Sequence, residues 1–273
     1  MSDEIGHKNP LPRHERWLQP VLLKVRPAPL ASLLKRILGI RRITIESSRG
    51  RFWIDPISNL GIALSRFGSY EPGMEATLDK YLPRGGTFVD LGANEGYFTV
   101  LAANMVGATG RVLAIEPQLR LIPIIEINLR SNDLSWVTVL NLAATNIPKL
   151  VTIYLSADMN TGATGQQNVA KYPLKAQHVT GLPLAEILDQ QGILTVDLLK
   201  VDIEGGEYDA LLGSRKIFQE GRVRAIALEL HPSILKLQNR NQDDITDMLI
   251  QCGYRKDTSS GNAVWQRPSQ LRD

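Results

Sequence analysis

The segment Thr87–Thr99 constrains the fold more than any other part of this chain. It begins as a short apolar strand, passes through a turn with glycines at Gly92 and Gly96, and continues into a helix. A second apolar strand, Arg111–Ile115, follows and ends in Glu116. This order of strand, glycine turn, helix, strand and terminal carboxylate is typical of a nucleotide-binding unit in a Rossmann-like sheet.

The remaining sequence continues the alternation of strands and helices. Strands are predicted at 137–140, 151–155, 195–201 and 222–230, and helices at 74–82, 117–129, 182–190, 208–219 and 243–252. This pattern predicts an α/β fold with a doubly wound, mostly parallel sheet. Segments 254–257 and 263–266 are expected to supply the antiparallel closing pair. Ligands bind at the carboxyl ends of such strands, where this chain has Asp90, Glu116, Asn141, Asp202 and His231.

Two regions depart from this alternation. Residues 1–70 are predicted to form an N-terminal basic extension, with two short helices within 17–38 and a hairpin made by 41–46 and 51–55. The main domain is predicted over 71–273. Residues 156–178 are rich in Gly, Thr, Gln and Asn, which predicts a long loop of the kind that often forms a lid or binding loop.

The charge distribution bears on possible partners. The net charge is +3, but residues 1–70 hold 12 Lys/Arg against 5 Asp/Glu, a surplus of +7, and the rest carries −4. We interpret this surplus as a solvated basic face and expect no nucleic-acid partner. The apolar spacing within 17–38 also fits packing on its own domain, on a partner subunit in a homodimer, or on a membrane surface.

The number of cysteines and the distribution of apolar residues limit the possible disulfides, metal sites and cellular compartment. Cys252 is the single cysteine, so neither an internal disulfide nor a multi-cysteine zinc site can form. The first sixteen residues are polar and lack the apolar core of a signal peptide, and no run approaches the roughly 18 apolar residues of a spanning helix. We therefore expect a cytoplasmic protein without a transmembrane segment.

The glycine spacing distinguishes between nucleotide ligands. A nicotinamide fingerprint, G-x-G-x-x-G, would need glycine at 94 and 97, where Asn94 and Tyr97 stand. The observed spacing suits a ligand without a pyrophosphate, because close backbone approach then matters more than anion capture. Glu116 is a carboxylate that can accept hydrogen bonds from both hydroxyls of a ribose. The alternative is an ordinary strand–helix turn.

Two motifs point to a known family. The pattern Asp90-x-Gly92-x-Asn94-x-Gly96 resembles motif I of class I S-adenosylmethionine-dependent methyltransferases. Together with the run Lys200-Val-Asp-Ile-Glu-Gly-Gly-Glu207, which follows the Leu-Ala-Glu-Ile-Leu helix at 184–188, it looks like the FkbM-type methyltransferases. Tyr70-Glu71-Pro72 and Asn141–Ala144 are similar to the same family. The resemblance covers about residues 50–266, and it departs from the family at Gly206, where alanine is common, and in a minor way at Glu186.

The resemblance implies the class I methyltransferase (Rossmann-like) fold, with a mostly parallel seven-stranded sheet and an antiparallel closing strand. It also implies methyl transfer from S-adenosylmethionine, with O-methylation of a small natural product or sugar as the expected reaction. The cofactor-binding residues that it implies are Glu71, Asp90, Gly92, Ala93, Asn94, Gly96, Tyr97, Glu116, Pro117, Ala143 and Asp202. Two rival functions remain open at this point. One is a non-catalytic binding protein that keeps the nucleotide fold, and the other is an NAD-dependent oxidoreductase.

Three residues compete for the role of general base toward an acceptor hydroxyl. Asp202, Glu204 and His231 all follow strand ends, and the ordinary pKa of a histidine, about 6.5, suits a base at neutral pH. Lys200 lies in a buried strand, needs a carboxylate such as Asp90 or Glu229, and is expected to organise the site. Asp202, Glu204 and His231 could also supply oxygen and nitrogen ligands to a divalent metal, but no spacing demands one and no metal ligand is assigned. The acceptor pocket is expected from 156–178, the Tyr70–Glu71 loop and the N-terminal extension.

Overall fold

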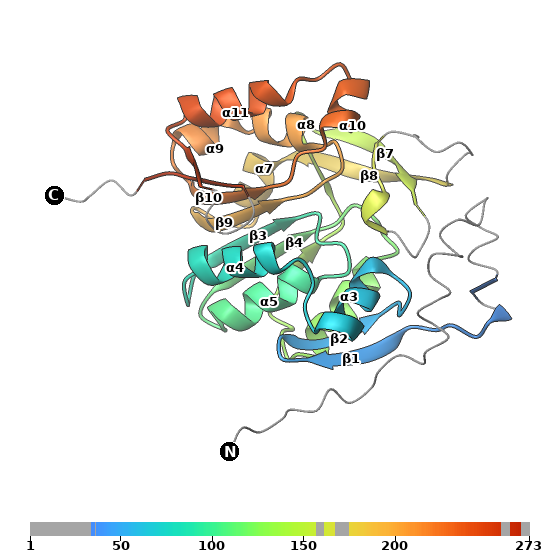
Figure 1. Cartoon of the computed structure of the whole chain (residues 1–273). Helices are drawn as coiled ribbons and strands as arrows, with labels where there is room; N and C mark the ends of the chain where they lie inside the picture. The colour runs from blue at the N-terminus through green and yellow to red at the C-terminus, as the bar shows by residue number, and fades with distance from the viewer. Residues whose placement is uncertain (1–33, 36, 157–160, 167–174, 258–262, 269–273) are drawn as a thin grey trace.

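The computed structural model describes residues 34–35, 37–156, 161–166, 175–257 and 263–268. Its centre is a seven-stranded sheet in the order β11-β12-β10-β9-β3-β4-β5 (Figure 1). The strands are β3 (Thr87–Leu91), β4 (Arg111–Ile115), β5 (Thr138–Leu140), β9 (Val196–Val201), β10 (Val223–Leu228), β11 (Arg255–Asp257) and β12 (Val264–Gln266). Neighbours from β5 to β10 pair in parallel, whereas β12 is antiparallel to both β10 and β11. The predicted sheet and its antiparallel closing strand are therefore confirmed.

Helices cover both faces of the sheet (Figure 1). One face carries α4 (Pro72–Tyr81), α5 (Tyr97–Val106) and α6 (Ile122–Arg130), and the other carries α7 (Leu184–Gln190), α8 (Glu207–Leu212), α9 (Arg215–Gln219), α10 (Pro232–Leu237) and α11 (Gln242–Gln251). Side chains that alternate along a strand enter different cores: Phe88 packs in one cluster and Val89 in the other. This pleat makes the apolar run of β3 fully buried, as a parallel strand between two helical layers requires.

Several helix boundaries differ from the sequence expectations. The helix expected from Pro117 begins at Ile122, because the backbone after β4 first turns so that the Gln118 amide can donate to the Glu116 carboxylate. The helix expected over 208–219 is divided into α8 and α9 at Gly213. A Cβ at Gly213 would lie 2.3 Å from the Asn146 Cα, so the chain makes a close contact there that an uninterrupted helix of ordinary residues would not permit.

A second, three-stranded sheet corrects the prediction of a long loop over 156–178. It contains β6 (Ala143–Thr145), β7 (Lys149–Leu155) and β8 (Lys175–Pro183) in the order β6-β8-β7. Residues 175–178 belong to β8 and pair antiparallel with β7, and Thr161–Ala163 form a short 3-10 turn. The polar composition concealed β8, since residues on the solvent-facing side of a strand can be polar without losing their ladder. Residues 157–160 and 167–174 lie outside the described residues.

The predicted N-terminal hairpin is confirmed as β1 (Ile43–Ser47) and β2 (Gly50–Ile54). It packs on α6: the Trp53 amide donates to Asn128 Oδ1 at 2.6 Å, and Phe52 and Ile54 join the same core as α5. A helix, α3 (Asn59–Phe67), follows and ends at Gly68 in the left-handed conformation. The two helices expected within 17–38 fall largely outside the described residues. Among the residues that are described, no helix has the length and apolarity to cross a bilayer.

Candidate active site

The glycine turn after β3 is shaped by its contact with β9. Gly92 has φ +85°, and a Cβ at this position would lie 1.9 Å from the carbonyl oxygen of Asp202. Gly96 has φ +82° at the start of α5, where a Cβ would meet Ile125 at 3.2 Å. Packing within the protein therefore already requires glycine at position 92, before any ligand is considered, because a side chain there would push the end of β9 away. Because the turn lacks side chains at Gly92 and Gly96, its backbone can also approach a ligand closely.

A cavity of about 380 Å³ lies over this turn at the carboxyl ends of β3, β4 and β9. That volume falls within the usual range of small-molecule sites. Most of the residues predicted to bind a cofactor line it: Glu71, Gly92, Ala93, Asn94, Tyr97, Glu116, Pro117 and Asp202. Lys200, Glu204 and Glu229 line it as well. The structure thus brings these residues from five separate parts of the sequence to one cavity.

Glu116 lies at the far end of the cavity in a buried position. Its Oε2 accepts a hydrogen bond from the Asn94 amide at 2.8 Å, and its Oε1 accepts one from the Gln118 amide at 2.9 Å. Only 2% of the residue is exposed, and this burial raises the pKa of the Glu116 carboxyl to about 7, although the two amide hydrogen bonds oppose the rise. The two amides fix the carboxylate in place while each oxygen keeps a lone pair for donors arriving through the cavity.

Lys200 forms the centre of a buried charge cluster. Its Nζ lies 3.5 Å from Asp90 Oδ1 and 3.4 Å from Asp202 Oδ2, and it donates to the Gly92 carbonyl at 3.2 Å. Although burial lowers the pKa of the Lys200 ammonium, the carboxylates of Asp202 and Asp90 outweigh that effect and raise it. Asp90 is fully buried, with Oδ2 accepting from Thr99 at 2.7 Å. Of the two partners considered for Lys200 from the sequence, Asp90 is the one the structure records.

Backbone strain gathers around the same cavity. Glu71, Asn94 and Glu204 are non-glycine residues with φ of 49°, 52° and 47°, and all three line it. Left-handed conformations cost such residues about 1 kcal/mol or more each, and they persist where the surrounding structure holds them.

His231 lines neither this cavity nor the second one described below, but it lies among carboxylates beside them. Its Nδ1 lies 2.7 Å from Oε1 of the buried Glu207, while Nε2 faces Glu204 at 3.6 Å and Asp202 at 3.9 Å. Burial lowers the pKa of His231, but the Glu207 hydrogen bond and the surrounding acids raise it to about 9. Burial raises the pKa of Glu204 to about 7, with the charge of His231 opposing the rise. The expectation of an ordinary histidine pKa near 6.5 is therefore wrong, because sequence spacing did not place Glu207 against the ring.

A second cavity, of about 550 Å³, adjoins the first. It is lined by the ends of β9 and β10 and by Met74, and it shares Glu71, Lys200, Asp202 and Glu229 with the first cavity. The shared wall holds three carboxylates and one ammonium group, so its formal charge is negative. Two ligands placed one in each cavity would meet at this wall.

Some predicted residues lie elsewhere, and some lining residues were not predicted. Asp90 is beneath the cavity and acts through Lys200, Gly96 sits behind the turn, and Ala143 lines a small neighbouring pocket together with Pro117. The sequence analysis missed Gln118, whose Nε2 donates to the Thr161 carbonyl at 3.1 Å and whose Oε1 accepts from Thr164 at 3.1 Å. It also assigned no role to Glu207, although this residue ends the Lys200–Glu207 run.

Comparisons with known proteins identify relatives of this arrangement. A family model described as the methyltransferase FkbM domain matches residues 90–256, which is more than half of the chain. A solved FkbM methyltransferase from Methylobacillus flagellatus is similar at 20% identity and a TM-score of 0.44, covering 66% of this chain and 43% of that one. This chain therefore matches less than half of the length of that protein.

Two further solved structures are similar over most of their length. A methyltransferase from Aquifex aeolicus that depends on S-adenosylmethionine has 17% identity and a TM-score of 0.42, covering 74% of this chain and 90% of that one. Fibrillarin from Aeropyrum pernix, crystallised with natively bound S-adenosylmethionine, has 13% identity and a TM-score of 0.38, covering 70% of this chain and 72% of that one. No curated protein sequence matches. These distant structural likenesses carry no argument about function.

Proposed function

This chain belongs to the FkbM methyltransferase family, and on that premise we propose that it transfers the methyl group of S-adenosylmethionine to a hydroxyl of a small natural product or sugar. Family membership favours this cofactor over NAD, as does the glycine spacing. The observation that carries the proposal is the pair of adjoining cavities with a shared acidic wall. One cavity contains Glu116 and the glycine turn, and the other is open for an acceptor.

The residues of the first cavity fit the cofactor. Glu116 is an acceptor-only carboxylate, nearly buried and facing the cavity, so the donors that suit it are the two hydroxyls of a ribose. The negative wall formed by Glu71, Asp202 and Glu229 suits the cationic sulfonium end of the same molecule. When bound, S-adenosylmethionine supplies an electrophilic methyl group on a good leaving group.

The chain's own contribution is then positioning and proton removal. Holding two reactants in line can supply about 7–11 kcal/mol of the barrier, and a general base adds about 10²–10⁴-fold. Asp202 and Glu204 line the first cavity, His231 lies within 4 Å of both, and we propose that the base is one of these three. Lys200, whose Nζ lies 3.4 Å from Asp202 Oδ2, positions this carboxylate.

The acidic wall also supports a small-molecule acceptor over a nucleic acid. Nucleic-acid binding depends on Lys and Arg contacts to phosphates, and carboxylates at the reaction site would repel that backbone. A hydroxyl on a neutral or cationic small molecule has no such penalty.

The test uses S-adenosylmethionine carrying a deuterated methyl group and a panel of hydroxyl-bearing and amine-bearing small molecules. We expect S-adenosylhomocysteine together with a deuterated methyl ether, identified by mass spectrometry and NMR. Glu116→Ala should weaken cofactor binding by at least tenfold, whereas Glu126→Ala, on the exposed face of α6, should leave it unchanged. Label recovered only in methylamines would overturn the hydroxyl assignment, and no transfer to any acceptor class would argue against the activity itself.

A further inference from the structure

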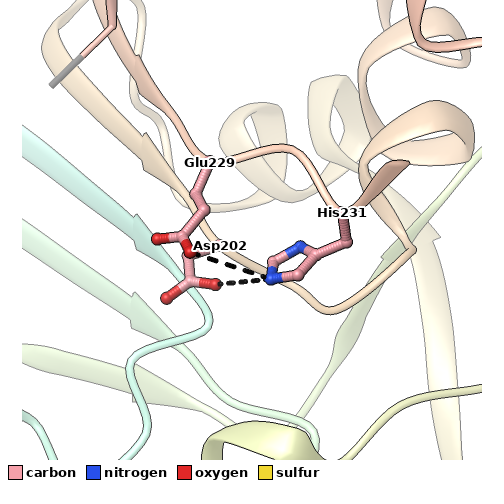
Figure 2. Close-up of side chains that lie close together, drawn as sticks. All are labelled: Asp202, Glu229 and His231. Atoms are coloured by element: carbon pink, nitrogen blue, oxygen red, sulfur yellow. Dashed lines mark ion pairs between the residues drawn. The ribbon is translucent and has the colours of Figure 1, made fainter. Parts of the chain in front are cut away.

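Three potential ligand atoms converge where β9 and β10 end. Asp202 follows β9, Glu229 follows β10, and His231 comes two residues later; one ligand atom from each lies within 4.8 Å of the others (Figure 2). The His231 Nε2 is 3.9 Å from Asp202 Oδ1 and 3.9 Å from Glu229 Oε1. We propose that Asp202, Glu229 and His231 bind a divalent metal ion.

The distances favour a bound cation over direct contacts. A separation of 3.9 Å exceeds the roughly 3.2 Å limit of an N–H···O hydrogen bond, so the imidazole makes no such bond to either carboxylate. A metal ion that binds nitrogen and oxygen at about 2.1 Å can join ligand atoms that are up to about 4 Å apart. Figure 2 shows the ring nitrogen directed between the two carboxylates, which leaves the central position for the ion.

Glu207 supplies an independent observation, because it orients the histidine for metal binding. Its Oε1 lies 2.7 Å from His231 Nδ1 and also accepts from the Gly205 amide at 3.1 Å, and the residue is fully buried. In the neutral imidazole, a carboxylate on one ring nitrogen selects the tautomer whose other nitrogen has a free lone pair. The same arrangement of carboxylate, histidine and ion recurs in protein metal sites. With Nδ1 held by Glu207, the proposed ligand nitrogen, Nε2, faces Asp202 and Glu229.

Local charge supports the same occupant. Lys200 makes its ion pairs with Asp90 and Asp202, and Glu204 Oε2 lies 3.6 Å from His231 Nε2. Asp202, Glu204 and Glu229 thus place three carboxylates around His231, and a doubly charged ion would offset their negative charge. Two carboxylates with one imidazole suit Mn²⁺ or Zn²⁺ better than an ion that prefers oxygen alone.

The position of the site gives the ion a function. Asp202 and Glu229 line both cavities, so an ion held between them can be reached from each. On the basis of the proposed methyl transfer, the ion would bind the acceptor oxygen and lower the pKa of its hydroxyl, as bound metals do for water. The binding site itself does not depend on that reaction.

The test titrates the full chain with Mn²⁺ alone and follows free Mn²⁺ by electron paramagnetic resonance. We expect one strong site, weakened at least tenfold by Glu229→Gln and by His231→Leu, and unchanged by Asp247→Asn on the exposed face of α11. Glu229 is 60% exposed in its side chain, so its variant tests the ligand without threatening the fold. Glu207→Gln should weaken binding by about tenfold while removing no ligand.

A second measurement separates this proposal from the methyltransferase proposal. Binding of S-adenosylhomocysteine to chelator-treated protein, measured by calorimetry, tests the cofactor cavity without the ion. No Mn²⁺ binding by the wild-type chain, or equal binding by Glu229→Gln, would overturn the metal site even if S-adenosylhomocysteine binds. Circular dichroism of each variant verifies that a loss of Mn²⁺ binding does not come from unfolding.

Discussion

Glu116 is expected to make the free protein less stable as the pH rises, and Glu116→Gln should remove that dependence. Burial raises the pKa of the carboxyl from 4.5 to about 7. Because the folded-state pKa lies above the unfolded one, the contribution to stability is full below pH 4.5 and is lost as the pH rises through 7. At about 1.4 kcal/mol per pH unit, this loss amounts to about 3 kcal/mol.

The measurement compares denaturant unfolding of the wild-type chain and Glu116→Gln from pH 5 to pH 8. Glutamine resembles the protonated carboxyl in being neutral, but its single oxygen can accept from only one of the Asn94 and Gln118 amides, so the variant loses one hydrogen bond at every pH. The difference in the free energy of unfolding should therefore shift by about 3 kcal/mol in favour of the variant as the pH rises. Glu126→Gln, in an exposed pair on α6, is the matched control and should follow the wild type throughout.

Cofactor binding should reverse this effect in the wild-type chain. Ribose hydroxyls donate to the ionised carboxylate, so S-adenosylhomocysteine should stabilise the wild type more at pH 8 than at pH 6, and Glu116→Gln should show a smaller increase. Parallel pH profiles of the two proteins without ligand would refute the argument, since they would mean that Glu116 ionises as it does in water.

Three further substitutions test contacts that hold the site together. Gly92→Ala should reduce the free energy of unfolding by about 3 kcal/mol, because its Cβ would lie 1.9 Å from a carbonyl oxygen at the end of β9; equal melting temperatures would contradict this. Arg42→Met should lower the free energy of unfolding by about 3 kcal/mol, because it leaves Glu95 buried without its partner; Glu95 is 2% exposed and accepts two 3.0 Å hydrogen bonds from the guanidinium. Restored stability in the double variant with Glu95→Gln is the check. Lys200→Met should cost about 3–5 kcal/mol because Asp90 would remain as a buried, unpaired charge, whereas Lys200→Arg should retain more of the stability in the same denaturant titration.

The sheet could be predicted because its information is local. Each strand is a short apolar run that is followed by a polar residue or glycine, and parallel connections place those residues at one edge. The prediction was wrong over 175–178, where β8 pairs with β7 across a separation in sequence that no local pattern reveals. It also missed the break between α8 and α9, which depends on the close approach of Gly213 to Asn146.

The sequence predicted which residues belong to the candidate site, but it did not predict their protonation. Motif spacing placed Glu116, Lys200 and Asp202 at strand ends, and the structure brings them to one cavity wall. Protonation could not be predicted in the same way. The pKa of Glu116 depends on burial, and that of His231 depends on burial and on a hydrogen bond from a residue 24 positions away. These are properties of surroundings assembled from separate segments.

The sequence by itself determined the family, the alternating fold and the glycine turn, because strand length, glycine placement and terminal carboxylates act within a few residues of one another. Only the tertiary structure decided which charges meet. It paired Lys200 with Asp90, seated Asp202 against the bare Gly92, and turned His231 toward Asp202 and Glu229. Electrostatic and hydrogen-bond energies depend on distances of a few ångström and on exclusion of water, and both arise only when distant segments pack.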